Sequence, residues 1–155
     1  MTFWFCTSLV SINIPNGITR IEEHTFQSCE SLTSITIPDS VISIGRFAFQ
    51  NCKTLNGIVI SNNVISIEDG AFSNCYILTS ATIGNGVTSI GRYAFEGCNS
   101  LTNVTFKGAI SSVNFSPEYP FPGDLRTKFY KTDPVNGTHG TYIRESGSNI
   151  WEKQP

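Results

Sequence analysis

The feature that most constrains this chain is the spacing of its cysteines. Each cysteine follows the previous one by 23 residues, giving Cys6, Cys29, Cys52, Cys75 and Cys98. An odd number of cysteines cannot be paired completely in disulfides within one chain. A fixed period of roughly 20 to 50 residues is instead typical of stacked repeats, in which each copy packs only on its neighbours. The spacing therefore predicts a solenoid.

Several apolar positions share the register of the cysteines. A leucine follows each cysteine by three residues, and isoleucine-rich positions follow it by six and by eight. A phenylalanine precedes each cysteine by three residues, giving Phe3, Phe26, Phe49, Phe72 and Phe95. The repeat reads C-x-x-L-x-x-I-x-I-x-x-x-[IV]-x-x-I-x-x-x-[AT]-F-x-x. One such unit cannot bury its apolar face alone, whereas stacked copies form a continuous core.

The pattern within one repeat predicts two walls. The segment L-x-x-I-x-I alternates as a strand does, and stacked copies of it would form a parallel sheet. Pro15, Pro38 or Gly84 ends this strand. The segment V-x-x-I predicts a short second strand on the opposite wall, and a short helical turn leads back to the next cysteine. We expect a β-rich solenoid of about four full repeats, truncated at its N-terminus.

The stretch from Cys29 to Phe49, CESLTSITIPDSVISIGRFAF, resembles the BspA-type (treponemal, 23-residue) leucine-rich-repeat family of bacterial surface proteins. The resemblance covers about residues 2–106. It implies a non-enzymatic protein-binding or adhesion module of a secreted or surface-displayed bacterial protein. Its implied partner is a protein or glycoprotein of the host matrix or of a neighbouring cell.

The register of the repeat is lost after Phe106. We therefore expect a leucine-rich-repeat solenoid over 1–106, and an irregular connection followed by a small C-terminal β cap over 107–155. Alternating residues predict strands over 125–130 and 140–144, with a third over 149–151. The G-T-Y-x-R and S-x-x-W-x-K stretches resemble the tail that follows such repeats in spirochaete proteins.

Two groups of outward-facing residues form the candidate binding surface. The hydroxyl and amide columns of the expected sheet supply Ser34, Thr36, Ser80, Thr82, Asn103 and Thr105. The opposite wall supplies Ile42, Ile65, Phe47 and Tyr93. The hydroxyl columns can bind glycans or an extended peptide, or simply remain hydrated. The apolar group either forms a contact surface or is buried against the C-terminal segment.

The N-terminus suggests an alternative role. The chain begins in the middle of a repeat, and Phe3, Trp4 and Phe5 would cover little of the exposed layer. Either the chain is a fragment of a longer solenoid, or its open end meets a partner. An uncapped apolar end with unpaired strands favours association. The alternative function is thus a structural spacer or self-assembly unit that associates through residues 1–26.

Composition argues against several other partners. Charged residues make up 14% of the chain and the net charge is -2, so we expect no nucleic-acid partner. No apolar run is long enough for a transmembrane helix, so we expect no membrane insertion. The first residues also lack the pattern of a signal peptide.

No catalytic or metal-binding motif stands out, so we expect no enzyme activity, no cofactor and no metal. His24 and His139 have no repeat-encoded nucleophile or carboxylate beside them. The cysteines are expected to form a reduced, buried ladder, with metal or redox chemistry as the alternative. The carboxylates along one edge are expected to be solvated, with a weak cation site as the alternative: Glu22, Glu23, Glu68 and Asp69.

Overall fold

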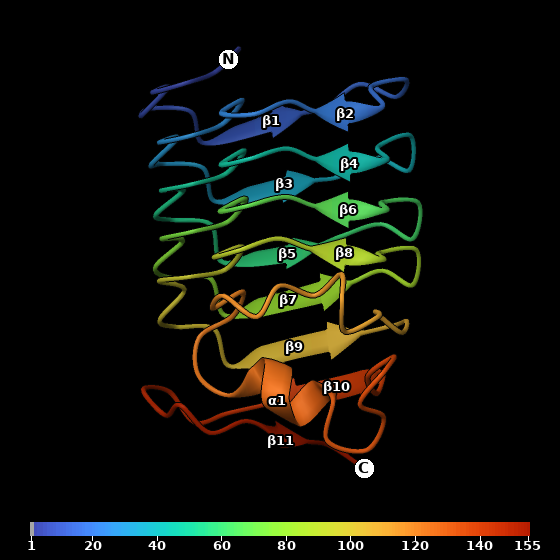
Figure 1. Ribbon diagram of the computed structural model, residues 1–155. Helices are drawn as coiled ribbons and strands as arrows, with labels where there is room; N and C mark the ends of the chain where they lie inside the picture. The colour runs from blue at the N-terminus through green and yellow to red at the C-terminus, as the bar shows by residue number, and fades with distance from the viewer. Residues whose placement is uncertain (1) are drawn as a thin grey trace.

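The computed structural model describes residues 2–155, and its short strands stack from the N-terminus to the C-terminus in two walls (Figure 1). The first wall contains β1 (Ser11–Asn13), β3 (Ser34–Thr36), β5 (Gly57–Val59), β7 (Ser80–Ile83) and β9 (Asn103–Phe106). The second contains β2 (Arg20–Ile21), β4 (Ser43–Ile44), β6 (Ser66–Ile67) and β8 (Ser89–Ile90). Paired strands are parallel and their partners lie one repeat apart, as with Ile44 and Ile67. The predicted solenoid with two walls is confirmed.

The two walls differ in continuity. Strands β2, β4, β6 and β8 form one four-stranded sheet. The first wall is divided, because β1 and β3 form one sheet whereas β5, β7 and β9 belong to another. The break falls between β3 and β5, beside Gly57.

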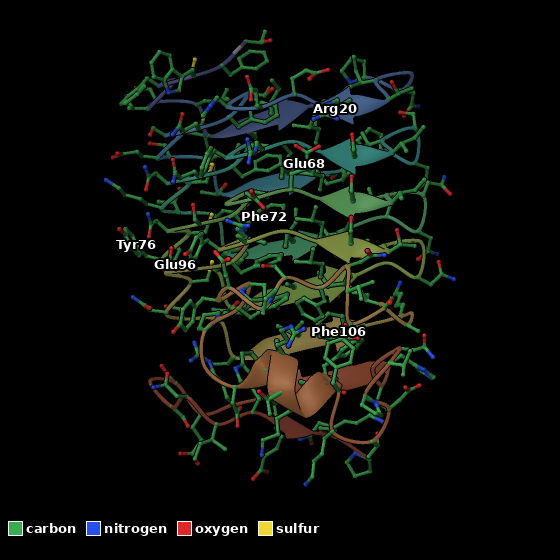
Figure 2. All side chains as sticks on the ribbon, in the orientation of Figure 1. Arg20, Glu68, Phe72, Tyr76, Glu96 and Phe106 are labelled. Atoms are coloured by element: carbon green, nitrogen blue, oxygen red, sulfur yellow. The ribbon has the colours of Figure 1, made fainter. Side chains whose placement is uncertain are left out.

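The core between the walls consists of ladders of identical or similar side chains. The phenylalanine rings of successive repeats stack with centroids 5.0 to 5.4 Å apart, from Phe3 to Phe95. Phe72 lies inside this stack, whereas Tyr76 and Glu96 project from the outer arc (Figure 2). Burial of one large apolar side chain contributes about 1.5–3 kcal/mol. Repetition of the same burial in every coil therefore holds the stack together.

The arc between the walls is a succession of hydrogen-bonded turns. The amide of Ala48 donates to the carbonyl of Gly45, and the amide of Cys52 donates to that of Phe49. The third residue of each turn has a positive φ, 52° at Phe47 and 59° at Asn51. A turn of this kind favours glycine or asparagine at that position. Residues one repeat apart share the conformation, so the arc has the same shape in each coil.

The solenoid continues beyond β9 for one further, irregular layer. The amide of Phe72 donates to the carbonyl of Ala94, 22 residues later, whereas that of Phe95 donates to Pro120, 25 residues later. The layer therefore contains three extra residues. Phe121 then stacks on Phe95 at 4.5 Å and extends the phenylalanine ladder.

A C-terminal β cap closes this end of the first wall. Strand β10 (Gly140–Ile143) pairs antiparallel with β9, and β11 (Glu152–Lys153) pairs antiparallel with β10. The third strand thus follows the expected 149–151 instead of occupying it. The prediction of a strand over 125–130 is wrong, because the segment forms helix α1 (Leu125–Phe129). Its two buried residues lie four positions apart, which places them on one side of a helix.

The side chain of Arg144, in the cap, binds backbone carbonyls of the last regular coil. Its guanidinium is buried and donates to the carbonyl oxygens of Leu101 at 2.6 Å and Asn99 at 3.0 Å. In an inner repeat, Glu30 occupies the position of Asn99, and its carbonyl accepts a hydrogen bond from the Thr54 hydroxyl of the next coil. The ring of Trp151 packs against the guanidinium, 5.2 Å from its carbon.

Candidate binding surfaces

The hydroxyl columns lie side by side on the outer face of the first wall. Ser80 is paired with Asn103 and Thr82 with Thr105 in adjacent strands. The side chain of Thr105 also contacts the Thr141 hydroxyl of β10 at 3.0 Å, so the cap extends this polar face. Ser34 and Thr36 belong to β3, across the break in the sheet, and are exposed.

A groove of about 530 Å³ crosses this face at the break. It spans β3, β5 and β7, and Thr36, Ser80 and Thr82 line it. Gly57 forms part of its floor and has no side chain to fill the space. The other sheet-face candidates, Ser34 among them, lie on the same wall but do not line the groove.

The groove combines apolar, hydroxyl and charged groups. Val59 is exposed within it, and Asp39 and Lys107 bring opposite charges to its lining. The hydroxyl of Ser61, also in the lining, is shielded from solvent and has no hydrogen-bond partner. Such a surface suits a ligand with both polar and apolar groups.

The groove residues Asp39, Val59 and Lys107 were not among the candidates that we identified in the sequence. Lys107 occupies the repeat position of Pro15, Pro38, Ser61 and Gly84, so a charge at a position that is otherwise uncharged was the available signal. The break in the sheet has a weaker signal, because β5 alternates as its neighbours do and differs only in carrying Gly57 where β3 and β7 carry serine.

The apolar candidates of the second wall occupy two different environments. Ile42 and Ile65 are 46% and 51% exposed and lie in adjacent coils, since the Ile65 amide donates to the Ile42 carbonyl. They are not buried against the C-terminal segment. Phe47 is half-buried and stacks on His24 at 5.4 Å, and Tyr93 is exposed with its hydroxyl 3.5 Å from Glu118.

The N-terminal end of the solenoid contains a second cavity, of about 390 Å³. Phe3 lines it together with Ile12, Ile18 and Phe26. The other two predicted edge residues, Trp4 and Phe5, are exposed and do not line the cavity. This cavity exposes apolar side chains of the first repeat that the structure describes.

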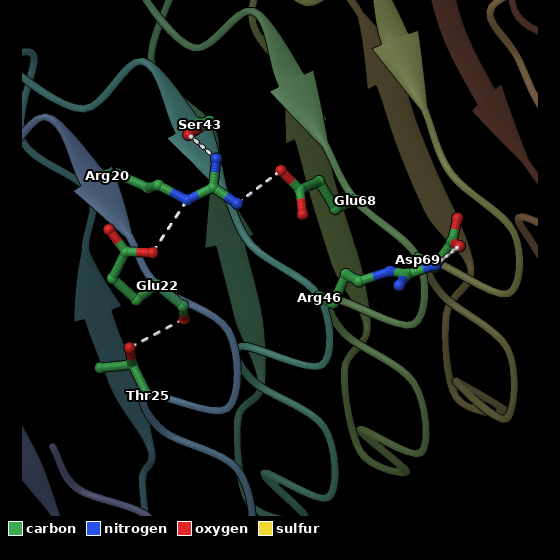
Figure 3. A network of polar contacts seen from close by, with 7 residues as sticks. All are labelled: Arg20, Glu22, Thr25, Ser43, Arg46, Glu68 and Asp69. Carbon is green, nitrogen blue, oxygen red and sulfur yellow. Dashed lines mark hydrogen bonds and ion pairs between the residues drawn. The ribbon is translucent and has the colours of Figure 1, made fainter. Parts of the chain in front are cut away.

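A ladder of charges follows the edge of the second wall (Figure 3). Arg20 donates to Glu22 at 3.0 Å and to Glu68 at 2.7 Å, and Arg46 donates to Asp69 at 2.9 Å. Partial burial raises the pKa of Asp69. Hydrogen bonds from Arg46 and from the Arg92 amide lower it by more, so this pKa lies below its usual value.

These pairs engage three of the four carboxylates that were the alternative cation site, Glu22, Glu68 and Asp69. Within residues 2–155, the structure contains no cluster of three His, Cys, Asp or Glu residues able to hold a metal ion. In the same residues no helix is long and apolar enough to cross a membrane. His24 bonds to Gln27 at 2.8 Å through Nδ1, and His139 is exposed in a loop.

The cysteines are free thiols, and those at 29, 52, 75 and 98 are buried whereas Cys6 is exposed. Each buried thiol donates to the carbonyl of a phenylalanine in the preceding coil, as Cys75 does to Phe49 at 3.2 Å. Burial raises the pKa of Cys29 to about 11 and that of Cys52 still higher. Such thiols are poor nucleophiles at neutral pH.

The repeats agree with a known family. A family model described as the BspA type leucine rich repeat region matches residues 1–121 with six copies. The chain belongs to this family. The match extends over the irregular layer that ends at Phe121, in agreement with the continued phenylalanine ladder. No curated protein matches the chain.

Solved structures of bacterial leucine-rich repeat proteins are similar to this chain. A leucine rich repeat protein of T. pallidum is 35% identical with a TM-score of 0.65, over 66% of this chain and 48% of its own. A leucine-rich repeat protein of Bacteroides ovatus is 30% identical with a TM-score of 0.54, over 67% of this chain and 33% of its own. A protein of Faecalibacterium prausnitzii, described as a leucine rich cell surface protein, is 34% identical with a TM-score of 0.49, over 64% and 32%. The chain thus spans less than half the length of these relatives.

Proposed function

We propose that this BspA-type chain is a non-enzymatic protein-binding module of a bacterial surface or secreted protein. The observation that carries the proposal is the groove across β3, β5 and β7. It presents hydroxyls at Thr36, Ser80 and Thr82 beside the exposed Val59, so it offers hydrogen bonds and apolar contact together. Its ligand is an extended segment of a protein or glycoprotein from the host matrix or a neighbouring cell.

The charges in the lining support a polypeptide ligand. Asp39 and Lys107 carry opposite charges, and a peptide with both a basic and an acidic residue complements them.

Equilibrium binding to matrix glycoproteins and mucins, at two salt concentrations, tests this proposal. We expect saturable binding to at least one of them. The double variant Thr36→Lys/Thr82→Lys fills the groove with long charged side chains and should abolish binding. The matched control Ile42→Ser/Ile65→Ser changes exposed residues on the other wall and should bind as the unchanged protein does. Absence of binding by the folded chain, or loss of binding only in the control, contradicts the proposal.

The apolar cavity at the N-terminal end supports a second candidate, a self-assembly role. In this role the repeats act as a spacer and the N-terminal edge joins another solenoid. The two roles use different surfaces, because Thr36 and Thr82 lie away from the cavity that Phe3 lines. One chain can therefore perform both.

A further inference from the structure

The outer arc departs from the repeat at one place in an inner coil, where two consecutive side chains are apolar and exposed. Tyr76 and Ile77 are 42% and 45% exposed. The other repeats carry a polar residue at the position of Tyr76, and serine or threonine at the position of Ile77. The apolar pair is therefore specific to this coil and is not part of the common repeat.

Ile77 gives up a hydrogen bond that its position can make between coils. Thr54 stands at this position in the preceding coil, and its hydroxyl donates to the carbonyl of Glu30 at 2.7 Å. Ile77 has no hydroxyl and cannot bind the matching carbonyl of Lys53. The stability of the coil does not explain this exchange of a hydrogen-bonded side chain for an exposed apolar one. Exposed apolar and tyrosine side chains side by side are instead typical of contact surfaces.

The carboxylate of Glu96 projects from the next coil beside this pair. The amide of Asn74 donates to the carbonyl of Glu96 at 2.7 Å, two residues before Tyr76. The amide of Ser100 donates to the carbonyl of Tyr76 at 3.3 Å, so the two coils run together here. Both Tyr76 and Glu96 point away from the arc (Figure 2). Glu96 is exposed, and among the residues that the structure describes none forms an ion pair with it.

A polar ladder occupies the repeat position of Glu96 in the earlier coils. Gln27 donates to Gln50, and Nε2 of Gln50 donates to the hydroxyl of Ser73 at 3.0 Å. This hydroxyl donates in turn to the carbonyl of Gly70, in its own coil, at 3.0 Å. The ladder thus ends at Ser73, and its last proton is not available to Glu96. The carboxylate remains free to bind a group from outside the chain.

We infer that Tyr76, Ile77 and Glu96 form a second binding surface, which takes an arginine flanked by aliphatic residues on a partner polypeptide. A guanidinium is attracted to the face of a tyrosine ring within about 6 Å of its centre. Its planar fork also matches a carboxylate, which an ammonium does not do as well. Successive coils are close enough for one guanidinium to do both, since the rings of Phe72 and Phe95 lie 5.0 Å apart. Ile77 then contacts an aliphatic neighbour of the arginine.

The chain shows the same set of groups elsewhere with its own arginine in place. The carboxylate of Glu118 lies 3.5 Å from the hydroxyl of Tyr93 and 3.5 Å from the guanidinium of Arg92. At Glu96 the tyrosine and the carboxylate are present and the arginine is supplied by the partner. This surface is separate from the groove, whose lining includes none of its three residues.

Amide chemical shifts of the whole chain, measured by NMR during titration with the peptide acetyl-Leu-Arg-Leu-amide, test this surface. We expect saturable shifts at Tyr76, Ile77 and Glu96, with a Kd in the millimolar range because so small a peptide makes few contacts. Tyr76→Ser and Glu96→Gln should each weaken binding about two- to fivefold. The uncharged peptide acetyl-Leu-Gln-Leu-amide should cause no saturable shifts at these residues.

The double variant Tyr93→Ser/Glu118→Gln is the matched control. It removes a tyrosine and a carboxylate that already contact Arg92, so the Kd of the peptide should be unchanged. Weakening by this control equal to that by Tyr76→Ser and Glu96→Gln, with all variants folded by their spectra, contradicts the inference. Absence of saturable shifts contradicts it as well.

Two further outcomes place the ligand or its chemistry elsewhere and also overturn the inference. Shifts confined to Thr36 and Lys107 would show that the arginine peptide occupies the groove. Saturable shifts at Tyr76 with maltotriose, a neutral sugar, that persist in Glu96→Gln would identify a glycan surface instead.

Discussion

The thiol of Cys52 donates a hydrogen bond to the carbonyl oxygen of Phe26, with Sγ 3.3 Å from the oxygen. The same oxygen accepts the amide of Cys29 within its own coil. The cysteine column therefore both fills the core and links each coil to the preceding one, which a purely apolar side chain of the same size would not do.

Removal of one such link should destabilise the solenoid measurably. We expect Cys52→Ala to lower the free energy of unfolding by about 1–2 kcal/mol, through the lost bond and the small cavity. Urea unfolding followed by circular dichroism measures the change. Cys6→Ala is the control, because Cys6 shares the repeat position but is exposed, and its effect should be close to zero. Equal effects of the two substitutions would contradict the linking role.

Arg144 should be a main contributor to the stability of the C-terminal end. Arg144→Met leaves the buried carbonyl of Leu101 without a donor, removes the bond to the Asn99 carbonyl, and should cost about 3 kcal/mol. Arg144→Lys should rescue little, since an ammonium lacks the planar fork that reaches several carbonyls. Arg92→Met, at an exposed arginine, is the control, and thermal unfolding of the three variants tests the difference.

Much of the fold follows from the sequence because the repeat length fixes which residues become neighbours. Once Ile44 and Ile67 are one period apart, stacking places them in register, and the walls and ladders follow. The cap was harder to predict, since L-R-T-K-F fits the alternation of a strand and also places Leu125 and Phe129 on one side of a helix. Packing of this segment against the final layer of the solenoid favours the helix over the strand. A contact between two different segments produces no repeating pattern in the sequence.

The candidate site was predicted only in part for a similar reason. Thr36, Ser80 and Thr82 stand in columns and were found, but the groove that they line depends on the break between β3 and β5. The break falls beside Gly57, where the neighbouring strands carry serine, and a single glycine does not by itself show that strand pairing stops. Lys107 likewise belongs to the candidate site only because it lines the groove, and the sequence did not predict the groove.

Substitution of Gly70 tests the backbone conformation of the arc. Its φ is +62°, and a Cβ atom there would lie 2.4 Å from the ring of Phe47. We expect Gly70→Ala to cost about 2–3 kcal/mol from the left-handed backbone and the clash together. In a double-mutant cycle with Phe47→Ala, the part due to the clash should disappear and the backbone part should remain. Strict additivity of the two substitutions would show that the ring does not restrict position 70.

Buried hydroxyl and thiol groups predict that stability falls in alkaline solution. Burial raises the pKa of Tyr142 from 10.0 to about 12 and that of Cys29 from 9.0 to about 11. The unfolded chain therefore loses these protons at a lower pH than the folded chain does. The stabilisation is complete below about pH 9 and is lost as the pH rises from there toward 12, by about 1.4 kcal/mol per pH unit for each group in its window.

Urea midpoints at neutral pH and at several values above pH 9 measure this decline. Tyr142→Phe serves as the internal test, because it removes one titrating group. It also removes the hydrogen bond from Tyr142 to the Thr138 carbonyl, so its stability at pH 7 should be about 1 kcal/mol lower. Between pH 10 and 12 its stability should nevertheless fall less steeply than that of the unchanged protein. Parallel pH profiles for the two proteins would show that the Tyr142 hydroxyl does not titrate differently in the folded and unfolded chains.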